Sequence, residues 1–394
     1  MKFFLSFYFL YFSFVLNASE IRGYTVGQVK AQTPILKESP RSFGSIVVEN
    51  INRLNYLGKS NKIQFEVGLE LNQVFQWVHD PLQERDFNKK NTAYRLEDFT
   101  PITGKSNSDI SSYYLLKQLD RLQVHYSFLS YDITFGRQQI SFGSAKLINP
   151  TDVFGAFSPT TINTEEKNGV DALRLKKAYG PNSELEIGVL FGNKFKAKNS
   201  AVFLRSIFSY KELEIKPIVM SYREAYGIGL DLLVPYRGAL LYLESLSTII
   251  DKKEYHSYNR TTVGLEYQLG SDFFVILEYH YNGDGREKAS EYDLTASSFS
   301  LERGANFYLG RHYFNAFINY QLTPLHLLSI TTFQNLTDHS NLLSPRWIWS
   351  FGENSTIETG LFLGLGKKTN IPLQSRSEFG SYGHQVFSKV TYYF

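Results

Sequence analysis

Strict alternation between apolar and polar residues is the strongest pattern in this chain and runs through most of it after residue 60. In KIQFEVGLEL, every second residue from Ile63 to Leu71 is apolar, and the residues between them are mainly Gln and Glu. Helical periodicity is weak nearly everywhere. Alternation of this kind predicts β-strands with one apolar and one polar face, and therefore an all-β chain. The same pattern recurs in residues 121–128, 184–191, 212–219, 263–269 and 357–365.

The lengths of the predicted strands and of their connections indicate a membrane barrel. The strands are about 9 to 15 residues long, which suits a tilted strand that crosses a bilayer. Counting them gives about 16 strands, within a range of roughly 14 to 18. Short turns such as Ser130-Tyr131 and Gly270-Ser271 alternate with longer loops such as 79–110 and 143–168. We therefore predict a transmembrane antiparallel up-and-down β-barrel with short turns at one rim and long loops at the other.

The aromatic content supports the barrel over a secreted soluble β-sandwich or propeller. Tyr, Phe and Trp make up 16% of the chain, although its mean hydropathy is only -0.24. Many of them, such as Trp77, Tyr236 and Trp347, fall near the ends of predicted strands, where the aromatic belts of membrane proteins lie. A propeller is disfavoured because no repeat of 20 to 50 residues is visible.

The first 61 residues are predicted to precede the barrel. Lys2, the apolar run 3–16 and the short polar segment after it match a secretory signal peptide over residues 1–18, with cleavage after Ala18. The apolar run is too short to span a bilayer comfortably. Residues 19–61 are interpreted as a periplasmic or lumen-associated segment, with an extra strand as the remaining alternative. Residues 62–394 are predicted to form the barrel.

The C-terminal stretch QVFSKVTYYF is an amphipathic strand that ends on an aromatic residue. Val390, Tyr392 and Phe394 share its apolar face. This ending resembles the assembly signal of outer-membrane barrel proteins. The resemblance implies insertion by the barrel assembly machinery, contact with outer-membrane lipid, and location in the outer membrane of a Gram-negative bacterium.

Several other classes of function lack their sequence signals. The formal net charge of +3 is spread along the chain, so no basic stripe indicates nucleic-acid binding. No HExxH, GxSxG or GxxxxGK motif occurs, and cysteine is absent. The run Asp338-His339-Ser340-Asn341 has hydrolase residue types, but neighbours on a strand point to opposite faces. We expect no enzyme activity, no catalytic residues, no metal and no cofactor.

The polar faces of the predicted strands carry charges of both signs. On the walls of a barrel such charges form cross-strand ion pairs, or they set the field in a water-filled pore. A barrel of about 16 strands is wide enough for an aqueous channel. The candidate pore-lining residues from these faces are Arg121, His125, Arg174, Glu184, Glu186, Glu278 and Arg311.

Arg137 does not fit the alternation around it. Ile133 and Phe135 belong to the lipid face, and strict alternation would place Arg137 there as well. An arginine facing the bilayer midplane costs about 2 to 4 kcal/mol. A bulge at Gly136 would turn Arg137 into the lumen, and the alternative is a position at the outer rim. We predict the bulge and the lumen.

The stretch around Arg137 resembles a known family. GRQQISFG followed by NPTDVF, and preceded by LDRLQVHYSFLSYDITF, is similar to the motif region of alginate-export-type and related porin-like outer-membrane barrels. The resemblance covers residues 119–154. It implies a pore-wall position for Gly136, Arg137 and Gln138, and it implies that the segment from Asn149 to Asp152 shapes a constriction or plug loop.

These features together predict a passive outer-membrane channel for small polar or charged solutes. One alternative is an alginate-type polysaccharide exporter, which would need a strongly electropositive lumen. Another is a non-conducting barrel whose long loops bind a partner. The sequence identifies neither the solute nor the charge selectivity, and it does not choose between a monomer and a trimer.

Overall fold

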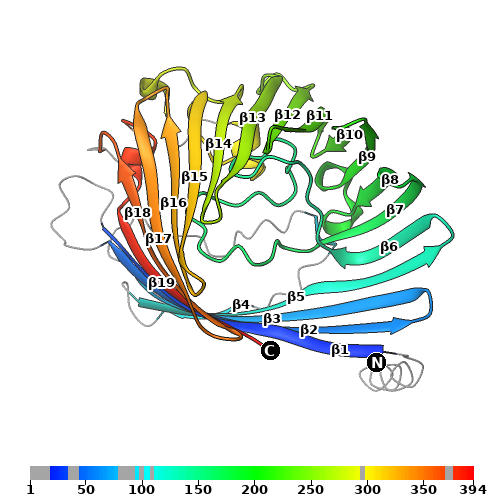
Figure 1. The fold of residues 1–394 in the computed structure, drawn as a ribbon, viewed down its shortest axis with the longest axis horizontal. Coiled ribbons are helices and arrows are strands. Elements are labelled where there is room, and N and C mark those ends of the chain that lie inside the picture. The colour runs from blue at the N-terminus through cyan, green and yellow to red at the C-terminus, as the bar shows by residue number, and fades with distance from the viewer. Residues whose placement is uncertain are drawn as a thin grey trace.

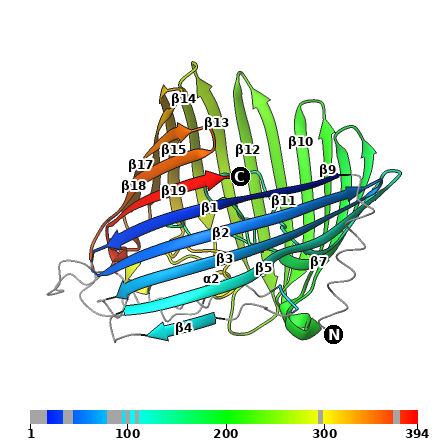
Figure 2. The ribbon, with the colours of Figure 1, turned by 90° about the horizontal axis from the view of Figure 1, so that it is seen from below.

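A closed antiparallel β-barrel forms the whole architecture (Figure 1). The computed structural model describes residues 18–33, 44–78, 94–96, 102–106, 111–292, 298–368 and 376–394. In these residues, β1 (Ala18–Gln32) pairs with both β2 (Ser45–Ser60) and β19 (Gln385–Tyr393), which closes the ring (Figure 2). Within the described residues, the short strand β4 (Ile102–Ser106) pairs only with β5, so 18 of the 19 strands found there make up the barrel. The predicted fold class is confirmed, with a strand count at the top of the expected range.

Each remaining strand pairs with its neighbours in chain order. Among the described residues, no helix is long and apolar enough to cross a bilayer. The only α-helix in those residues is α2 (Phe299–Glu302), in the β14–β15 loop. The other strands are β3 (Ile63–Val78), β5 (Ser111–Phe128), β6 (Tyr131–Gln138), β7 (Val170–Gly180), β8 (Ser183–Leu190), β9 (Ala201–Tyr210), β10 (Leu213–Tyr222), β11 (Ala225–Tyr236), β12 (Ala239–Ile250), β13 (Tyr258–Leu269), β14 (Phe273–Asn282), β15 (His312–Thr323), β16 (His326–Asn335), β17 (Ser340–Gly352) and β18 (Ser355–Leu365).

The outer surface of the barrel is apolar, as the alternation predicts. Side chains such as Phe135, Ile187, Ile228 and Val263 are exposed on the wall, while their neighbours along each strand face inward. Exposed aromatic residues such as Tyr236 lie near strand ends. An apolar outer band with aromatic residues at its edges matches the hydrocarbon core and interfaces of a bilayer.

The two rims of the barrel differ in their connections. Tight turns, such as 61–62, 129–130 and 181–182, join strands at the rim where Phe394 lies. Most connections at the other rim are longer, and residues 139–169 and 283–311 are the longest of those fully or largely described. Two connections at this rim, 223–224 and 336–339, are nevertheless short. The predicted rim asymmetry is therefore present.

The N-terminal segment is part of the barrel wall, which corrects the predicted boundary at residue 62. β1 is paired with β2 along its full length, and β2 is also paired with β3 along its full length. Of the two interpretations of residues 19–61, the extra strand is nearer to the structure, in which the region forms two strands. The alternation misses them because Thr25, Asn50 and Asn52 lie on the outer face, where apolar residues are expected. The predicted signal peptide lies almost entirely outside the described residues.

The loop between β6 and β7, residues 139–169, crosses the lumen (Figure 1). Its side chains Phe142 and Phe154 pack into one apolar cluster with lumen-facing residues of β7 to β13. Ile148 and Ile162 belong to a second cluster, with residues of β15 to β19. Because these clusters cover a large part of the inner wall, the loop divides the lumen and leaves polar space beside β1 to β3.

Candidate functional site

Glu244 on β12 holds one end of the lumen loop through its backbone. The carboxylate accepts the N–H groups of Ser144 and Ala145 at 2.9 Å each, and the N–H and hydroxyl of Thr151 at 2.7 and 2.8 Å. Glu244 is fully buried. A buried carboxylate requires a cation or several donors, and these loop donors meet that need.

Glu278 on β14 holds the next turn of the same loop. Its two oxygens accept the N–H groups of Lys146, Leu147 and Ile148 at 2.6, 3.1 and 3.0 Å. Tyr242 adds a hydroxyl at 2.7 Å. We predicted Glu278 as a pore-lining charge, but it is 1% exposed, and its oxygens are occupied by loop donors. We call Glu244 and Glu278 the anchoring glutamates.

Asn149 and Asp152 shape the loop from within, at the positions suggested by the family resemblance. The Asn149 amide donates to the Phe142 carbonyl at 2.6 Å, and its oxygen accepts the N–H groups of Thr151 and Asp152 at 3.1 and 3.0 Å. Asp152 forms an ion pair with Lys167 across the loop. Burial raises the pKa of Asp152, while the Lys167 ammonium acts in the opposite direction. Both residues therefore stabilise the fold of the loop.

A bulge in β5 gathers three arginines around one carboxylate. The β3–β5 pairing shifts between Gly68 and Leu69, which leaves Asp120 without a partner residue on β3. Asp120 accepts from Arg53 and Arg95 at 2.9 Å each and also forms an ion pair with Arg121. The three arginines are at most 3% exposed. The predicted pore residue Arg121 thus belongs to a buried ion network.

Arg137 lies at the end of β6 and is not turned by a bulge. The β5–β6 and β6–β7 pairings run through Gly136 without a register shift, so the predicted bulge is wrong. Arg137 forms a bidentate pair with Asp171 at 2.7 and 2.9 Å and donates to the Leu119 carbonyl. It is 5% exposed. The pair lies at the end of β6, directly before the loop that begins at residue 139.

Gly136 is required by the backbone at this point. Its φ is +113°, and a Cβ there would lie 2.1 Å from the Leu122 carbonyl oxygen on β5. A side chain is excluded by both facts. The role of Gly136 is thus close packing of β6 against β5, two residues before β6 ends.

The other predicted pore residues are spread along the wall. His125 and Arg174 line a cavity of about 530 Å³ next to the turn 61–62. Arg174 pairs with Glu186, and Lys176 pairs with Glu184 at 3.0 Å. The remaining two lie elsewhere. Gln138 is buried and donates to the Ala172 carbonyl, and Arg311 pairs with Glu287 at the loop rim.

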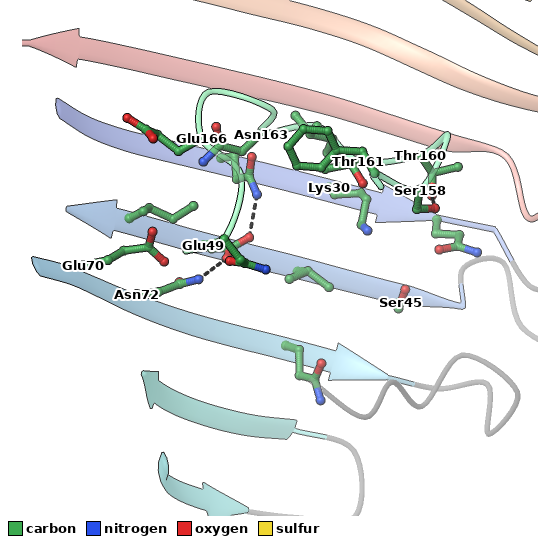
Figure 3. Close-up of a pocket in the computed structure, with 18 of the residues that line it drawn as sticks. Lys30, Ser45, Glu49, Glu70, Asn72, Ser158, Thr160, Thr161, Asn163 and Glu166 are labelled. Carbon is green, nitrogen blue, oxygen red and sulfur yellow. Dashed lines mark hydrogen bonds between the residues drawn. The ribbon is translucent and has the colours of Figure 1, made fainter. Parts of the chain in front are cut away.

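A polar cavity of about 330 Å³ lies between the lumen loop and the wall of β1 to β3 (Figure 3). Three glutamates and one lysine line it, and the remaining residues are mainly amides and hydroxyls. We call it the loop cavity. In Figure 3, Asn163 and Glu166 of the loop lie over the strand that carries Lys30, and Glu49 and Asn72 lie on the next two strands. The other lining residues are Tyr24, Gln28, Lys30, Gln32, Ser45, Val47, Ile51, Glu70, Gln76, Phe157, Ser158, Thr160, Thr161, Ile162 and Asn168.

The three glutamates of the loop cavity have different partners. Glu166 lies 2.7 Å from Arg121 and 3.7 Å from Arg53, and Glu70 lies 3.6 Å from Arg53. Glu49 instead accepts the side-chain amides of Gln28, at 2.5 Å, and Asn72. Among the described residues, no group of His, Cys, Asp and Glu is arranged to hold a metal ion.

None of the predicted pore residues lines the loop cavity, and its own residues were missed. Glu49 and Gln28 lie on strands that were not recognised, because their outer faces are partly polar. Asn72 and Glu70 lie on the polar face of a predicted strand, and the alternation 62–71 signalled that face. What the sequence does not show is that the loop would fold against this part of the wall.

The fold is similar to those of solved outer-membrane channels. OccAB1 of Acinetobacter baumannii matches with a TM-score of 0.58 and 12% identity, over 96% of this chain and 97% of that one. OccD3 (OpdP) of Pseudomonas aeruginosa matches with a TM-score of 0.55 and 8% identity, over 96% and 92%. No protein-family model and no curated protein matches the sequence. This chain therefore has a porin-like β-barrel fold.

Proposed function

We propose that this protein is a porin-like outer-membrane channel for passive passage of small polar or charged solutes. The observation that carries the proposal is the lumen loop, which fills part of a wide barrel and leaves a polar cavity against one wall. Barrels of this width enclose an aqueous channel unless they are plugged. A loop that narrows the lumen beside charged side chains is suited to selecting among small solutes.

The outer surface and the C-terminus support an outer-membrane location. The apolar outer wall needs a bilayer, and the fold is shared with solved channels of that membrane. Val390, Tyr392 and Phe394 lie exposed on the outer face at the end of the chain, in reach of an assembly factor. We propose that they form the signal read by the barrel assembly machinery.

An exporter of a polyanion such as alginate is less well supported. Such a channel requires free positive charge along the lumen. Arg53, Arg95 and Arg121 are buried around Asp120, and Arg174 is paired with Glu186. The positive charges of these arginines are therefore paired with carboxylates of the protein.

Ion conductance in a planar lipid bilayer tests the proposal. We expect the purified, folded protein to produce stepwise current increases in potassium chloride, because each inserted barrel adds one aqueous path. Protein unfolded by heating in detergent is the matched control and should produce none. A folded protein that inserts into the bilayer without conducting contradicts the proposal and favours a non-conducting barrel whose loops bind a partner.

Liposome swelling then examines the solute class. We expect small uncharged sugars and amino acids to enter vesicles that contain the protein faster than they enter protein-free vesicles. An oligosaccharide too wide for the space beside the lumen loop should remain outside. Equal entry of small and large solutes would mean that the loop does not narrow the lumen.

A further inference from the structure

Three polar side chains lie side by side on the wall of the loop cavity, on three adjacent strands. Gln28 on β1 is the direct cross-strand partner of Glu49 on β2, and Asn72 on β3 is the diagonal neighbour of Glu49. All three line the loop cavity. We call Gln28, Glu49 and Asn72 the acceptor trio.

The hydrogen bonds inside the trio orient its two amides. The nitrogens of Gln28 and Asn72 both donate to the Glu49 carboxylate, so their carbonyl oxygens take no part in these hydrogen bonds. Neither carbonyl oxygen has a donor in the described part of the chain, although both atoms are buried. Asn72 itself is only 3% exposed. A buried acceptor without a donor costs about 1–3 kcal/mol, so a ligand that brings donors is favoured here.

Glu49 also differs from the other two glutamates of the loop cavity in its partners. No lysine or arginine of the described residues forms an ion pair with it, whereas Glu70 and Glu166 in the same cavity both face arginines. The trio therefore combines one carboxylate with two buried carbonyl oxygens that have no donor among the described residues. A ligand that satisfies it carries a positive charge and several N–H groups in a small volume.

We propose that the acceptor trio binds the ammonium group of primary-amine solutes as they pass the lumen loop. This inference rests on the proposed channel function and names the solute class. An ammonium group has three donors and no acceptor, which matches one carboxylate and two carbonyl oxygens. A carboxylate ligand is repelled by Glu49, and an alcohol brings a single donor and no charge. The hydroxyls and amides of Thr161 and Asn163 on the loop face the remainder of the solute.

Block of single-channel current by n-butylammonium chloride tests the proposal. We expect the amine to reduce the potassium current saturably, while n-butanol and sodium butyrate have no saturable effect. Glu49→Gln removes the charge and should raise the half-blocking concentration about tenfold, equivalent to about 1.4 kcal/mol. Gln28→Leu keeps the charge but removes one open acceptor. It should raise that concentration about threefold, and it tests the site independently if the first variant does not fold.

Glu66→Gln is the matched control. Glu66 lies on the same strand as Asn72, faces the lumen and accepts from Gln123 at 2.6 Å, but it does not line the loop cavity. Its replacement removes the same charge and should leave the half-blocking concentration unchanged. Equal block of the wild type and Glu49→Gln, or equal block by butanol, overturns the inference while the channel function stands. Absence of any potassium current overturns the channel function instead.

Discussion

Two opposite walls of this barrel carry glutamates whose surroundings differ in kind. On β12 and β14, the anchoring glutamates Glu244 and Glu278 are saturated by backbone N–H groups of the lumen loop. On β2, Glu49 receives only two side-chain amides, and these leave their own oxygens open. The first wall holds the loop, and the second faces the space that the loop leaves.

The difference shows that a charge on the inner wall has no fixed role. A backbone N–H group offers one donor and no acceptor, so it satisfies a carboxylate completely. A side-chain amide satisfies the carboxylate but brings a new acceptor with it. Glu278 therefore stabilises the structure, while Glu49 and its neighbours retain binding capacity.

The largest effect is expected at Asp120 on β5, beside the second wall. In Asp120→Asn, Arg53, Arg95 and Arg121 lose their shared carboxylate, and removing one member of a buried ion network costs about 3–5 kcal/mol. Urea unfolding should show this loss in the free energy of unfolding. Asp132→Asn is the control, because Asp132 is half-exposed and lies 3.4 Å from His125 near a tight turn. Equal stability of the two variants would show that the arginines do not depend on Asp120.

Replacement of an anchoring glutamate should have the second largest effect. Glu278→Gln places an amide nitrogen against the N–H groups of the loop, and leaving these donors unsatisfied costs about 1–3 kcal/mol. The loosened loop should increase current noise and make cleavage after Lys146 by trypsin faster. Glu49→Gln should leave both properties unchanged, because Glu49 has no hydrogen bond to the loop. Wild-type current noise in Glu278→Gln would show that Glu278 does not hold the loop and that the two walls do not differ in this respect.

Glu378 resembles the anchoring glutamates, and we expect its stabilising effect to depend on pH. It lies in the β18–β19 loop and accepts from Tyr313, Asn335 and the N–H of Leu309, and burial raises its pKa to about 7. Because the pKa is higher in the folded state, its stabilising effect is complete below about pH 4.5 and is lost as the pH rises through 7.

Hydrogen exchange at residues 376–382, corrected for the intrinsic rates, measures this effect. We expect protection to fall by roughly 2–3 kcal/mol between pH 5 and pH 8. Glu378→Gln cannot titrate and should give a flat profile over this range. A wild-type profile as flat as that of the variant would assign the docking of this loop to apolar packing alone.

The smallest effect is expected from the exposed ion pair of the lumen loop. Lys146 lies 3.2 Å from Glu266 on β13, and its side chain is 44% exposed. An exposed pair of this kind contributes about 0–1 kcal/mol. Glu266→Gln should therefore leave the current noise and the rate of tryptic cleavage near the wild-type values. A loop as loose as in Glu278→Gln would mean that surface charge, and not backbone capture, holds it.

The sequence by itself determined the fold class, because alternation is a local property that any stretch of strand displays. It located the barrel wall from Ile63 onward, the rim asymmetry and the inward-folding loop around Asn149. It missed β1 and β2, whose outer faces carry Thr25, Asn50 and Asn52. Outward polar residues blur the signal on which strand prediction depends.

Tertiary structure alone decided the roles of the charged residues. Glu49, Glu278 and Glu66 all lie on inward faces, and nothing local distinguishes them. Their roles depend on where one loop, distant in sequence, lies across the lumen and which donors it presents to each wall. Hydrogen bonds act over about 3 Å, so only the folded chain settles which carboxylate is saturated and which is left to bind a solute.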